Sequence, residues 1–193
     1  MKEIYKAPCG DLLIEVMSGN VIRCSWISCA DTEPASYVGG CCEPGDCEGS
    51  LAGMSVPETD RQVMALALRQ LEEYFSGRRA EFELPLSAEG TPFRKKVWEC
   101  LKTIPFGEVV SYSALAERCG CHGGQRAVAC ACGSNRIAVI QPCHRVVGCS
   151  GSLGGYTVIT TGRQRGAKPE GLAIKRFLLN HEKEMLERWR LKG

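Results

Sequence analysis

The charges of this chain are divided unequally between its two halves, and this division limits which half can bind a polyanion. Residues 1–85 hold 7 lysines and arginines against 14 aspartates and glutamates, whereas residues 86–193 hold 17 against 8. The short polar run Ser87–Gly90 lies where the charge changes sign and is typical of a linker between domains. We therefore expect two domains, residues 1–86 and 87–193, of which only the second suits a polyanion. An ordinary solvated basic surface would give the same count.

Length and hydropathy exclude some classes of protein. A chain of 193 residues with 44% hydrophobic content can bury a core. No apolar run reaches the roughly 18 residues that a membrane span needs. Asp11 and Glu15 interrupt the apolar residues near the N-terminus, so no signal-peptide pattern is present there. We expect a monomeric protein of the cytoplasm, or of the nucleus in a eukaryote, with no membrane partner.

Thirteen cysteines are present, an odd and high number. Without a signal peptide, free thiols in a reducing compartment are the expected state. Cysteines cluster at Cys41–Cys47, Cys119–Cys121 and Cys130–Cys132, but none of these clusters has the paired C-x2-C spacing of a structural zinc site. The interpretation is therefore incidental cysteines and no metal site, with metal binding at a cluster as the alternative.

The first half has the signals of a small α/β unit. Apolar-rich runs at 11–18 and 21–27 flank Ser18–Asn20 and predict a β-hairpin. Residues 30–58 are rich in Gly, Pro and Cys and predict a long loop. Thr59 opens a capping-box pattern, which predicts a helix with an apolar stripe from Met64 to Phe75, closed by Gly77.

The second half has the signals of short helices. Thr91 as N-cap and Pro92 at the first helical position predict a helix that buries Trp98. Ser111 can cap another short helix, and the Gly-rich run 120–124 separates it from a helix of small residues at 125–132. Two short helices around such a turn match a helix-turn-helix, although a packed helical hairpin would match equally well.

The run Gln141–Val147 places Cys143 between a proline and a histidine, directly after the apolar segment Ile137–Ile140. That segment predicts a short buried strand, and Pro142 restricts the backbone just before the sulfur. A thiol is a strong nucleophile only as the thiolate, which an adjacent base favours. A buried structural cysteine beside a histidine would give the same local pattern.

The second half resembles the catalytic domain of the O6-alkylguanine-DNA alkyltransferase family. The motifs that match stand in the family's order over about half the chain: Thr91–Phe93, Ile104–Glu108, Ser111-Tyr112, Gln125–Val128, Gly133–Asn135, Pro142–Val146, Gly155-Tyr156, Gly171–Ala173 and Leu178–Glu182. The resemblance implies an α+β fold, in which a ribonuclease-H-like α/β domain precedes a helical domain with a winged-helix-like helix-turn-helix. It also decides for DNA as the partner of those two helices.

The activity implied by the resemblance is direct-reversal DNA repair. Cys143 would accept, irreversibly and once, the alkyl group of O6-alkylguanine in double-stranded DNA after base flipping, with O4-alkylthymine as a further candidate lesion. His144 would be the base, and Glu182 would orient its imidazole. Asn135 matches a hinge asparagine, and Tyr112 matches a tyrosine that crowds the target phosphate and protonates the leaving guanine. No cofactor is implied.

The DNA contacts implied by the resemblance lie mainly on the second of the two short helices. Arg126 matches a finger that fills the space left by the flipped base, and Ala127 and Ala129 let the helix approach the minor groove closely. Tyr156 and Thr157 would wall the guanine pocket. Lys175 matches a lysine near the leaving base.

One segment departs from the family's pattern. Residues Thr157–Glu170 form an insertion with three basic residues, Arg163, Arg165 and Lys168, where the family has a tight turn. We expect this insertion to modulate DNA affinity or the access of bulky alkyl groups without joining the chemistry. Two alternatives to repair remain: a lesion-binding module without chemistry, and a thiol- or metal-based sensor with a helix-turn-helix output.

Overall fold

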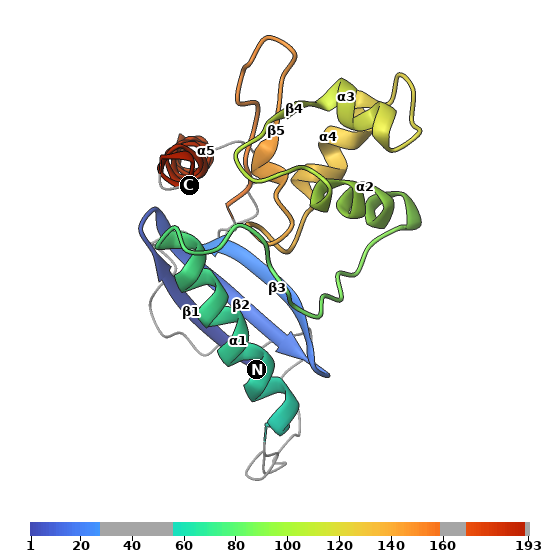
Figure 1. Ribbon diagram of the computed structural model, residues 1–193. Helices are drawn as coiled ribbons and strands as arrows, with labels where there is room; N and C mark the ends of the chain where they lie inside the picture. Colours follow the sequence, from blue (N-terminus) through green and yellow to red (C-terminus); the bar gives the residue numbers. More distant parts are fainter. Residues whose placement is uncertain (28–55, 159–168, 192–193) are drawn as a thin grey trace.

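The computed structural model describes residues 1–27, 56–158 and 169–191 (Figure 1). Its first part is a three-stranded antiparallel sheet in the order β1-β2-β3, formed by β1 (Lys2–Ala7), β2 (Gly10–Met17) and β3 (Asn20–Ile27). Helix α1 (Glu58–Phe75) lies across this sheet. The predicted hairpin and helix are thereby confirmed, whereas β1 was not predicted. The expected loop at 30–58 lies almost entirely outside the described residues.

The hairpin turn is held from both sides. Ser18 and Gly19 have φ angles of 51° and 71°, as a tight two-residue turn between twisted strands requires. The amide of Gly19 donates to Asp60 of α1 at 2.5 Å. The predicted capping role of Thr59 is wrong: α1 begins at Glu58, and Pro57 at the N-cap has no side-chain hydrogen bond. The fixed φ of a proline starts this helix instead.

The second part contains three helices that pack on one another: α2 (Pro92–Lys102), α3 (Tyr112–Arg118) and α4 (Gln125–Gly133). Thr91 and Ser111 cap α2 and α3 through their side-chain oxygens, as expected. Helices α3 and α4 with the turn between them form the predicted helix-turn-helix (Figure 1). A short parallel pair, β4 (Val110–Ser111) and β5 (Val146–Val147), adjoins them.

The prediction of a strand at Ile137–Ile140 is wrong. All four residues are buried, but only Ile137 pairs, through an isolated bridge to Cys24 of β3. The chain then turns, with Val139 at a φ of 69° and the Ile140 amide donating to Ala138. Backbone hydrogen bonds to β3 end after Ala138, since the chain must turn there to enter the short 3-10 helix η2 (Cys143–Arg145).

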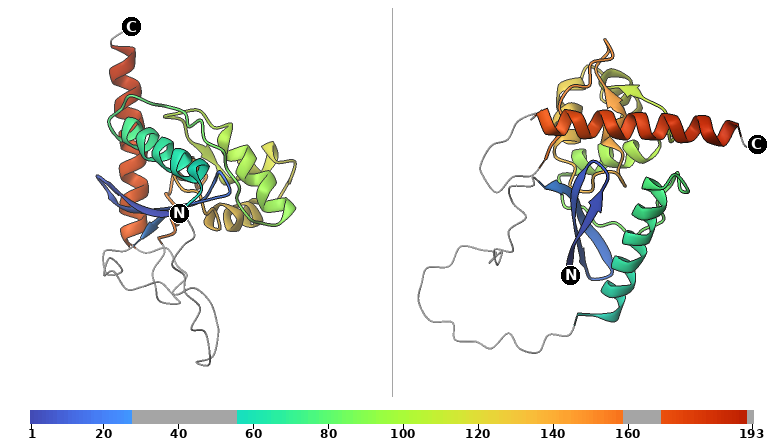
Figure 2. Two further views of the ribbon diagram at one scale, coloured as in Figure 1. Left: turned by 90° about the horizontal axis from the view of Figure 1, so that it is seen from below. Right: turned by 90° about the vertical axis from the view of Figure 1, so that its left-hand side faces the viewer.

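Helix α5 (Pro169–Arg190) joins the two parts (Figure 2). Its Trp189 donates to the carbonyl of Gly77 after α1, and His181 bonds to the carbonyl of Tyr74 within α1. Buried residues from both parts form one continuous apolar cluster. The α+β fold is as expected, and the boundary at residues 86/87 stays a prediction.

Two expectations concern features of the whole chain. Among the described ranges, no helix combines the length and the apolar character needed to cross a bilayer. Arg163, Arg165 and Lys168 of the predicted insertion lie outside the described residues.

Candidate active site

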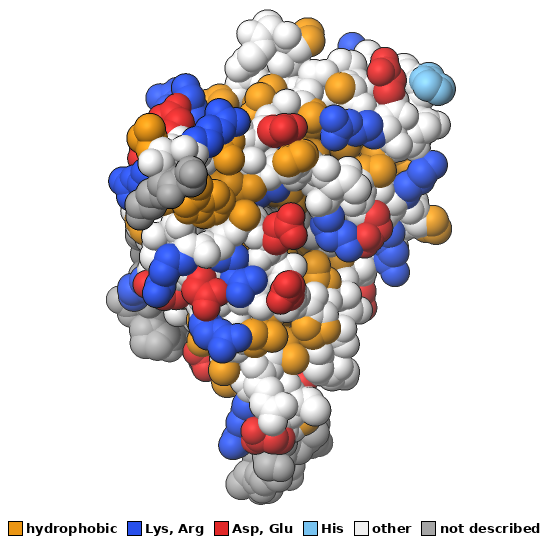
Figure 3. All heavy atoms as spheres, viewed as in Figure 1, with side chains coloured by type: hydrophobic (Ala, Val, Ile, Leu, Met, Phe, Trp, Pro, Cys, Tyr) orange, Lys and Arg blue, Asp and Glu red, His pale blue; other side chains and the backbone are white. Residues whose placement is uncertain are grey.

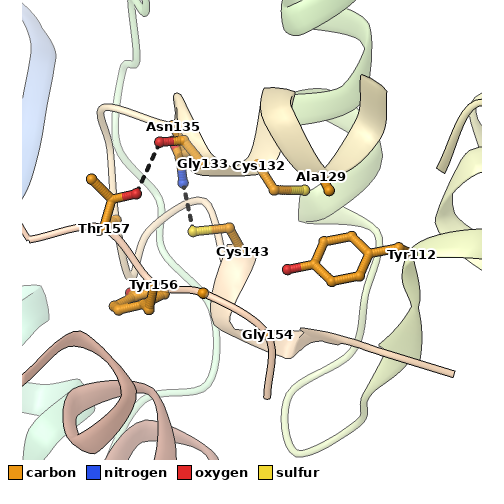
Figure 4. A pocket seen from close by; sticks show the side chains of 11 residues that line it. Tyr112, Ala129, Cys132, Gly133, Asn135, Cys143, Gly154, Tyr156 and Thr157 are labelled. Atoms are coloured by element: carbon orange, nitrogen blue, oxygen red, sulfur yellow. Dashed lines mark hydrogen bonds between the residues drawn. The ribbon is translucent and has the colours of Figure 1, made fainter. Parts of the chain in front are cut away.

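A cavity of about 390 Å³ opens between α3, α4 and the segment after β5. Its lining comes entirely from the second half of the chain: Tyr112, Ala129, Cys132, Gly133, Asn135, Ala138, Cys143, Gly154, Gly155, Tyr156 and Thr157. Cys143 and Tyr112 line this cavity from different elements, and Figure 4 shows the Tyr112 hydroxyl directed toward Cys143 while the Cys143 sulfur points toward Asn135. A volume of this size lies within the range of small-molecule sites.

The Cys143 thiol lies on this cavity and is otherwise enclosed. Its side chain accepts a hydrogen bond from the Asn135 amide at 3.3 Å (Figure 4). Burial raises the pKa of the thiol, while the amide of Asn135, the charge of Lys175 and the hydroxyl of Tyr156 pull that pKa down. The resting group is therefore a neutral thiol with partners that would stabilise a thiolate once it forms.

Asn135 also fixes the turn that presents the cysteine. Its side-chain NH2 donates to the carbonyl of Gln141 at 2.8 Å, and its side-chain oxygen accepts from the amide of Ile137 at 3.0 Å. Asn135 directly follows α4 and its C-cap residue Ser134. One amide therefore couples the end of α4 to the entry of the Cys143 turn.

Behind the turn, the Glu182 carboxylate accepts hydrogen bonds from several donors. Arg145 reaches both of its oxygens, with Nε 2.9 Å from Oε2 and Nη2 2.9 Å from Oε1. The amide of Gly107 donates to Oε2 at 3.0 Å, from a residue whose φ of 75° favours glycine. Burial alone would raise the pKa of Glu182, but His144 and Arg145 outweigh it and hold this pKa well below its ordinary value.

His144 directly follows Cys143 in the sequence, and its side chain is fully buried. Its Nε2 is 2.7 Å from Glu182 Oε1. An ionised carboxylate can only accept, so the histidine is the Nε2–H tautomer and Nδ1 keeps a free lone pair. Nδ1 has no hydrogen-bond partner among residues 1–27, 56–158 and 169–191. Burial lowers the pKa of His144 despite the opposing charge of Glu182, so the ring is neutral near pH 7.

Tyr112 and Lys175 flank the other side of the site. Burial raises the pKa of Tyr112 to about 12, so this phenol stays protonated. Lys175 is fully buried and donates to the carbonyls of Val146 and Leu153, at 2.6 Å and 2.5 Å. Its ammonium lies 5.9 Å from the centre of the Tyr112 ring. Lys175 therefore sits behind the cavity wall rather than on it.

Comparisons with known proteins give the site a context. The model of the 6-O-methylguanine DNA methyltransferase DNA-binding domain matches residues 92–184, and that of its ribonuclease-like domain matches residues 2–88. The chain belongs to this methyltransferase family. A methylated-DNA–protein-cysteine methyltransferase of Methanosarcina barkeri is 45% identical over 120 residues, which are 62% of this chain and 68% of the relative.

Other relatives match over a shorter part of their length. A methyltransferase of Mycolicibacterium paratuberculosis is 47% identical over 95 residues, which cover 49% of this chain and only 58% of the relative. Among solved structures, the Mycobacterium tuberculosis OGT in complex with DNA is 32% identical with a TM-score of 0.69, covering 95% of this chain and 93% of that one.

In this member of the methyltransferase family, the outer face of α4 borders the cavity. Arg126 and Ala127 are exposed there, whereas Ala129 is half-buried and lines the cavity. Ala127 and Ala129 have small side chains, which leave room for another molecule to come close to the backbone of α4 beside the cavity. On the face of the molecule in Figure 3, Lys and Arg side chains are interspersed with Asp and Glu rather than gathered in one patch.

The structure separates the predicted site residues of this family member into groups. Those on the cavity are Tyr112, Ala129, Asn135, Cys143, Tyr156 and Thr157. His144, Glu182 and Lys175 are buried behind it, and Arg126 and Ala127 lie on the open face of α4. Their roles stay predictions.

Residues that the sequence reasoning did not select also contribute. Cys132 and Gly133 line the cavity, and Tyr74 and Trp26 of the first half bond to site residues. Cys132 and Gly133 follow Ala129 at positions i+3 and i+4, so they share its helix face, and this spacing could have revealed both. In the part of the chain that is described, no cluster of three metal-binding side chains occurs. Cys41, Cys42 and Cys47 lie outside it.

Proposed function

We propose that this chain repairs alkylated DNA by direct reversal, taking the alkyl group of O6-alkylguanine onto Cys143. The observation that carries this proposal is the placement of Cys143 on a cavity of about 390 Å³, with the His144–Glu182 pair buried behind it. The relatives named methylated-DNA–protein-cysteine methyltransferases and the related OGT solved with DNA support the same reaction class.

The chemistry would begin with activation of the thiol. His144 has its Nε2–H committed to Glu182, so its free Nδ1 can take the Cys143 proton through one water molecule. The Sγ–C bond then forms as the bond between the alkyl carbon and guanine O6 breaks. The electron pair of that bond leaves with the guanine, which takes a proton from the Tyr112 phenol. The phenol proton is restored from the solvent.

The product explains why this chain would act once. The product is a stable thioether, because its cleavage would have to expel a thiolate from an unactivated alkyl carbon, and no residue of the described cavity is placed to assist that step. The protein would therefore be a stoichiometric acceptor that needs no cofactor. O4-alkylthymine is a second candidate lesion, because its alkyl–oxygen bond presents the same electrophilic carbon.

Access to the lesion requires the base to leave the duplex. Flipping costs about a few kcal/mol, and Arg126 on the exposed face of α4 would offset part of this by filling the vacated space. Ala127 and Ala129 would allow α4 into the minor groove, and Thr157 and Tyr156 would face the flipped guanine. We propose that the protein is a monomer and acts in the cytoplasm, or in the nucleus of a eukaryote.

The test uses a duplex oligonucleotide with one O6-methylguanine. After incubation, mass spectrometry of the peptides should show about 14 Da, the mass of one CH2, added at Cys143. Mass spectrometry of the oligonucleotide should show an unmodified guanine. An unmodified Cys143 with the lesion intact but bound would favour a lesion-binding module instead. An unmodified Cys143 with neither binding nor repair would remove both readings and leave a sensor role.

A further inference from the structure

Tyr74 of α1 reaches into the site from the first half of the chain. Its hydroxyl donates to Glu182 Oε1 at 2.7 Å, and its side chain is fully buried. The ring is held by aromatic neighbours, with centroids of Phe82 and Phe106 at 5.4 Å and 6.0 Å. Burial, reinforced by the charge of Glu182, raises the pKa of Tyr74 well above its usual value, so the phenol is a donor and not a phenolate.

Glu182 Oε1 therefore serves Tyr74 and His144 at the same short distance. Both donors lie 2.7 Å from this one oxygen, and Arg145 Nη2 lies 2.9 Å from it. The lone pairs and the charge of a single carboxylate oxygen are shared among these donors. The hydrogen bond from the Tyr74 hydroxyl therefore weakens the attraction between this oxygen and the His144 imidazole.

We infer that Tyr74 is a positioning residue for the proposed alkyl transfer, acting through Glu182 to keep His144 a neutral Nε2–H base. The inference rests on the proposed function. Tyr74 belongs to none of the motifs of the second half, and it is 108 positions away from Glu182 in the sequence. The first half of the chain would thus take part in the reaction without touching the substrate.

The sign of the effect follows from the charges around the pair. His144 is surrounded by Glu182 and by the cations Arg145 and Lys175, with Cys143 before it in the turn. His181 of α5 bonds to the Tyr74 carbonyl and not to the carboxylate. Removal of the Tyr74 hydroxyl leaves more of the Glu182 charge to the imidazole, which raises the pKa of His144. A more basic His144 is protonated over a wider range and cannot accept the thiol proton there.

The experiment measures the rate of alkyl transfer from free O6-benzylguanine as a function of pH, for the full chain and for Tyr74→Phe. We expect the acid limb of the Tyr74→Phe profile to move up by about one pH unit, with the rates converging on the alkaline side. The matched control is Tyr5→Phe, because Tyr5 also donates to a carboxylate, Glu72, at 2.9 Å, but on the exposed surface. Its profile should coincide with that of the unaltered chain.

A purely structural role for Tyr74 predicts a different result. Loss of packing would lower the rate by one factor at all pH values, or lower the melting temperature, and would leave the limb in place. An unshifted limb in a folded Tyr74→Phe protein overturns the inference. If the unaltered chain transfers no alkyl group at all, the proposed function fails instead, so the two failures are distinguishable.

A second background tests whether Tyr74 acts through Glu182. In Glu182→Gln the shared negative charge is absent, so adding Tyr74→Phe should cause no further shift of the limb. A further shift in that background contradicts action through Glu182. Nitrogen-15 NMR of the three histidines provides a readout without any reaction. It should show the Nε2–H tautomer for His144 in the unaltered chain and a higher midpoint of its titration in Tyr74→Phe, and a midpoint that stays in place counts against the inference.

Discussion

The two halves of this chain contribute to one site in different ways. Among the described residues, the cavity is lined only by residues between 112 and 157, whereas the first half supplies hydrogen bonds to the groups behind that lining. Trp26 Nε1 of β3 donates to the Tyr156 hydroxyl at 3.2 Å, and Tyr74 of α1 donates to Glu182 at 2.7 Å. The first half thus orients groups that the second half presents to the ligand.

The backbone of β3 adds to this support. Ala138 donates to the carbonyl of Cys24 at 2.6 Å, and Cys24 donates to the carbonyl of Arg136 at 2.8 Å. These bonds hold the segment that enters the Cys143 turn. The difference between the halves teaches that the reacting groups are close in the sequence, while the groups that orient them are distant. Substitutions in the two halves should therefore differ in size and in kind.

The largest effect is expected at the nucleophile. Cys143→Ala should abolish alkyl transfer completely, because no other group at the site has the same placement against Asn135 and the cavity. Affinity for DNA should stay within about twofold, since a thiol is not a phosphate contact. Rates come from single-turnover assays and affinities from fluorescence anisotropy. Cys149→Ala, at an exposed cysteine, is the control; residual transfer by Cys143→Ala would point to a second acceptor.

Glu182→Gln should come next, with a rate roughly 100-fold lower through loss of the His144 orientation. It should also lower the free energy of unfolding by about 3–5 kcal/mol, because Arg145 is left without its buried anion. The pKa of Glu182 is depressed in the folded state below its ordinary 4.5. Its stabilisation is therefore complete above about that pH and is lost as the pH falls further.

Denaturant unfolding as a function of pH checks this prediction. The unaltered chain should lose stability below about pH 4.5 more steeply than Glu182→Gln, which lacks the group. Glu184 is exposed on the same helix, so Glu184→Gln should behave like the unaltered chain. Parallel curves for Glu182→Gln and the unaltered chain would show that Glu182 does not hold its charge through Arg145 and His144.

Arg126→Ala should have a smaller and more selective effect. Without a side chain to fill the space of the flipped base, transfer from duplex DNA should slow by roughly 10- to 100-fold. Transfer from free O6-benzylguanine should be unchanged, because no flipping is needed. Comparison of the two substrates in single-turnover assays gives the ratio, with Arg61→Ala on the exposed face of α1 as the control. Equal losses on both substrates would place Arg126 in the pocket chemistry.

The smallest effect is expected in the first half. Trp26→Phe removes the donor to the Tyr156 hydroxyl together with part of a buried ring, so the protein should lose some stability, and transfer from the free base should slow by roughly 2- to 10-fold through the lost hydrogen bond. Trp189→Phe removes a similar bond, to Gly77, away from the cavity and should leave the rate unchanged. Equal rates for both variants would mean that β3 supports the fold but not the site.

The helix starts of the second half and the hairpin of the first could be predicted because their signals are local. Side-chain caps such as Thr91 and Ser111 act within one helical turn, and the hairpin turn depends on two residues of positive φ. The strand predicted at Ile137–Ile140 failed because burial alone does not distinguish a strand from a buried turn. Strand β1 alternates exposed and half-buried residues, but Glu3 lies on its half-buried face and Ile4 on its exposed face, so its sequence has no polar-apolar alternation from which a strand could be predicted.

The contacts between the halves could not be predicted in this way. Trp26 and Tyr156 are separated by 130 positions, and Tyr74 and Glu182 by 108. Neither pair has a spacing that a periodic pattern could reveal, since the contact depends on how the whole sheet meets α4 and α5. The ring of Tyr74 also resembles an ordinary core residue on the apolar stripe of α1.

The measurement that tests the central claim most directly is the number of lesions repaired by each protein molecule. Duplex DNA containing O6-methylguanine is supplied in several-fold excess, and repaired guanine is counted together with alkylated Cys143. The account predicts a plateau at one repaired lesion per protein, matched by one thioether at Cys143. Repair that continues beyond one equivalent, or a plateau at which Cys143 remains a free thiol, would contradict it.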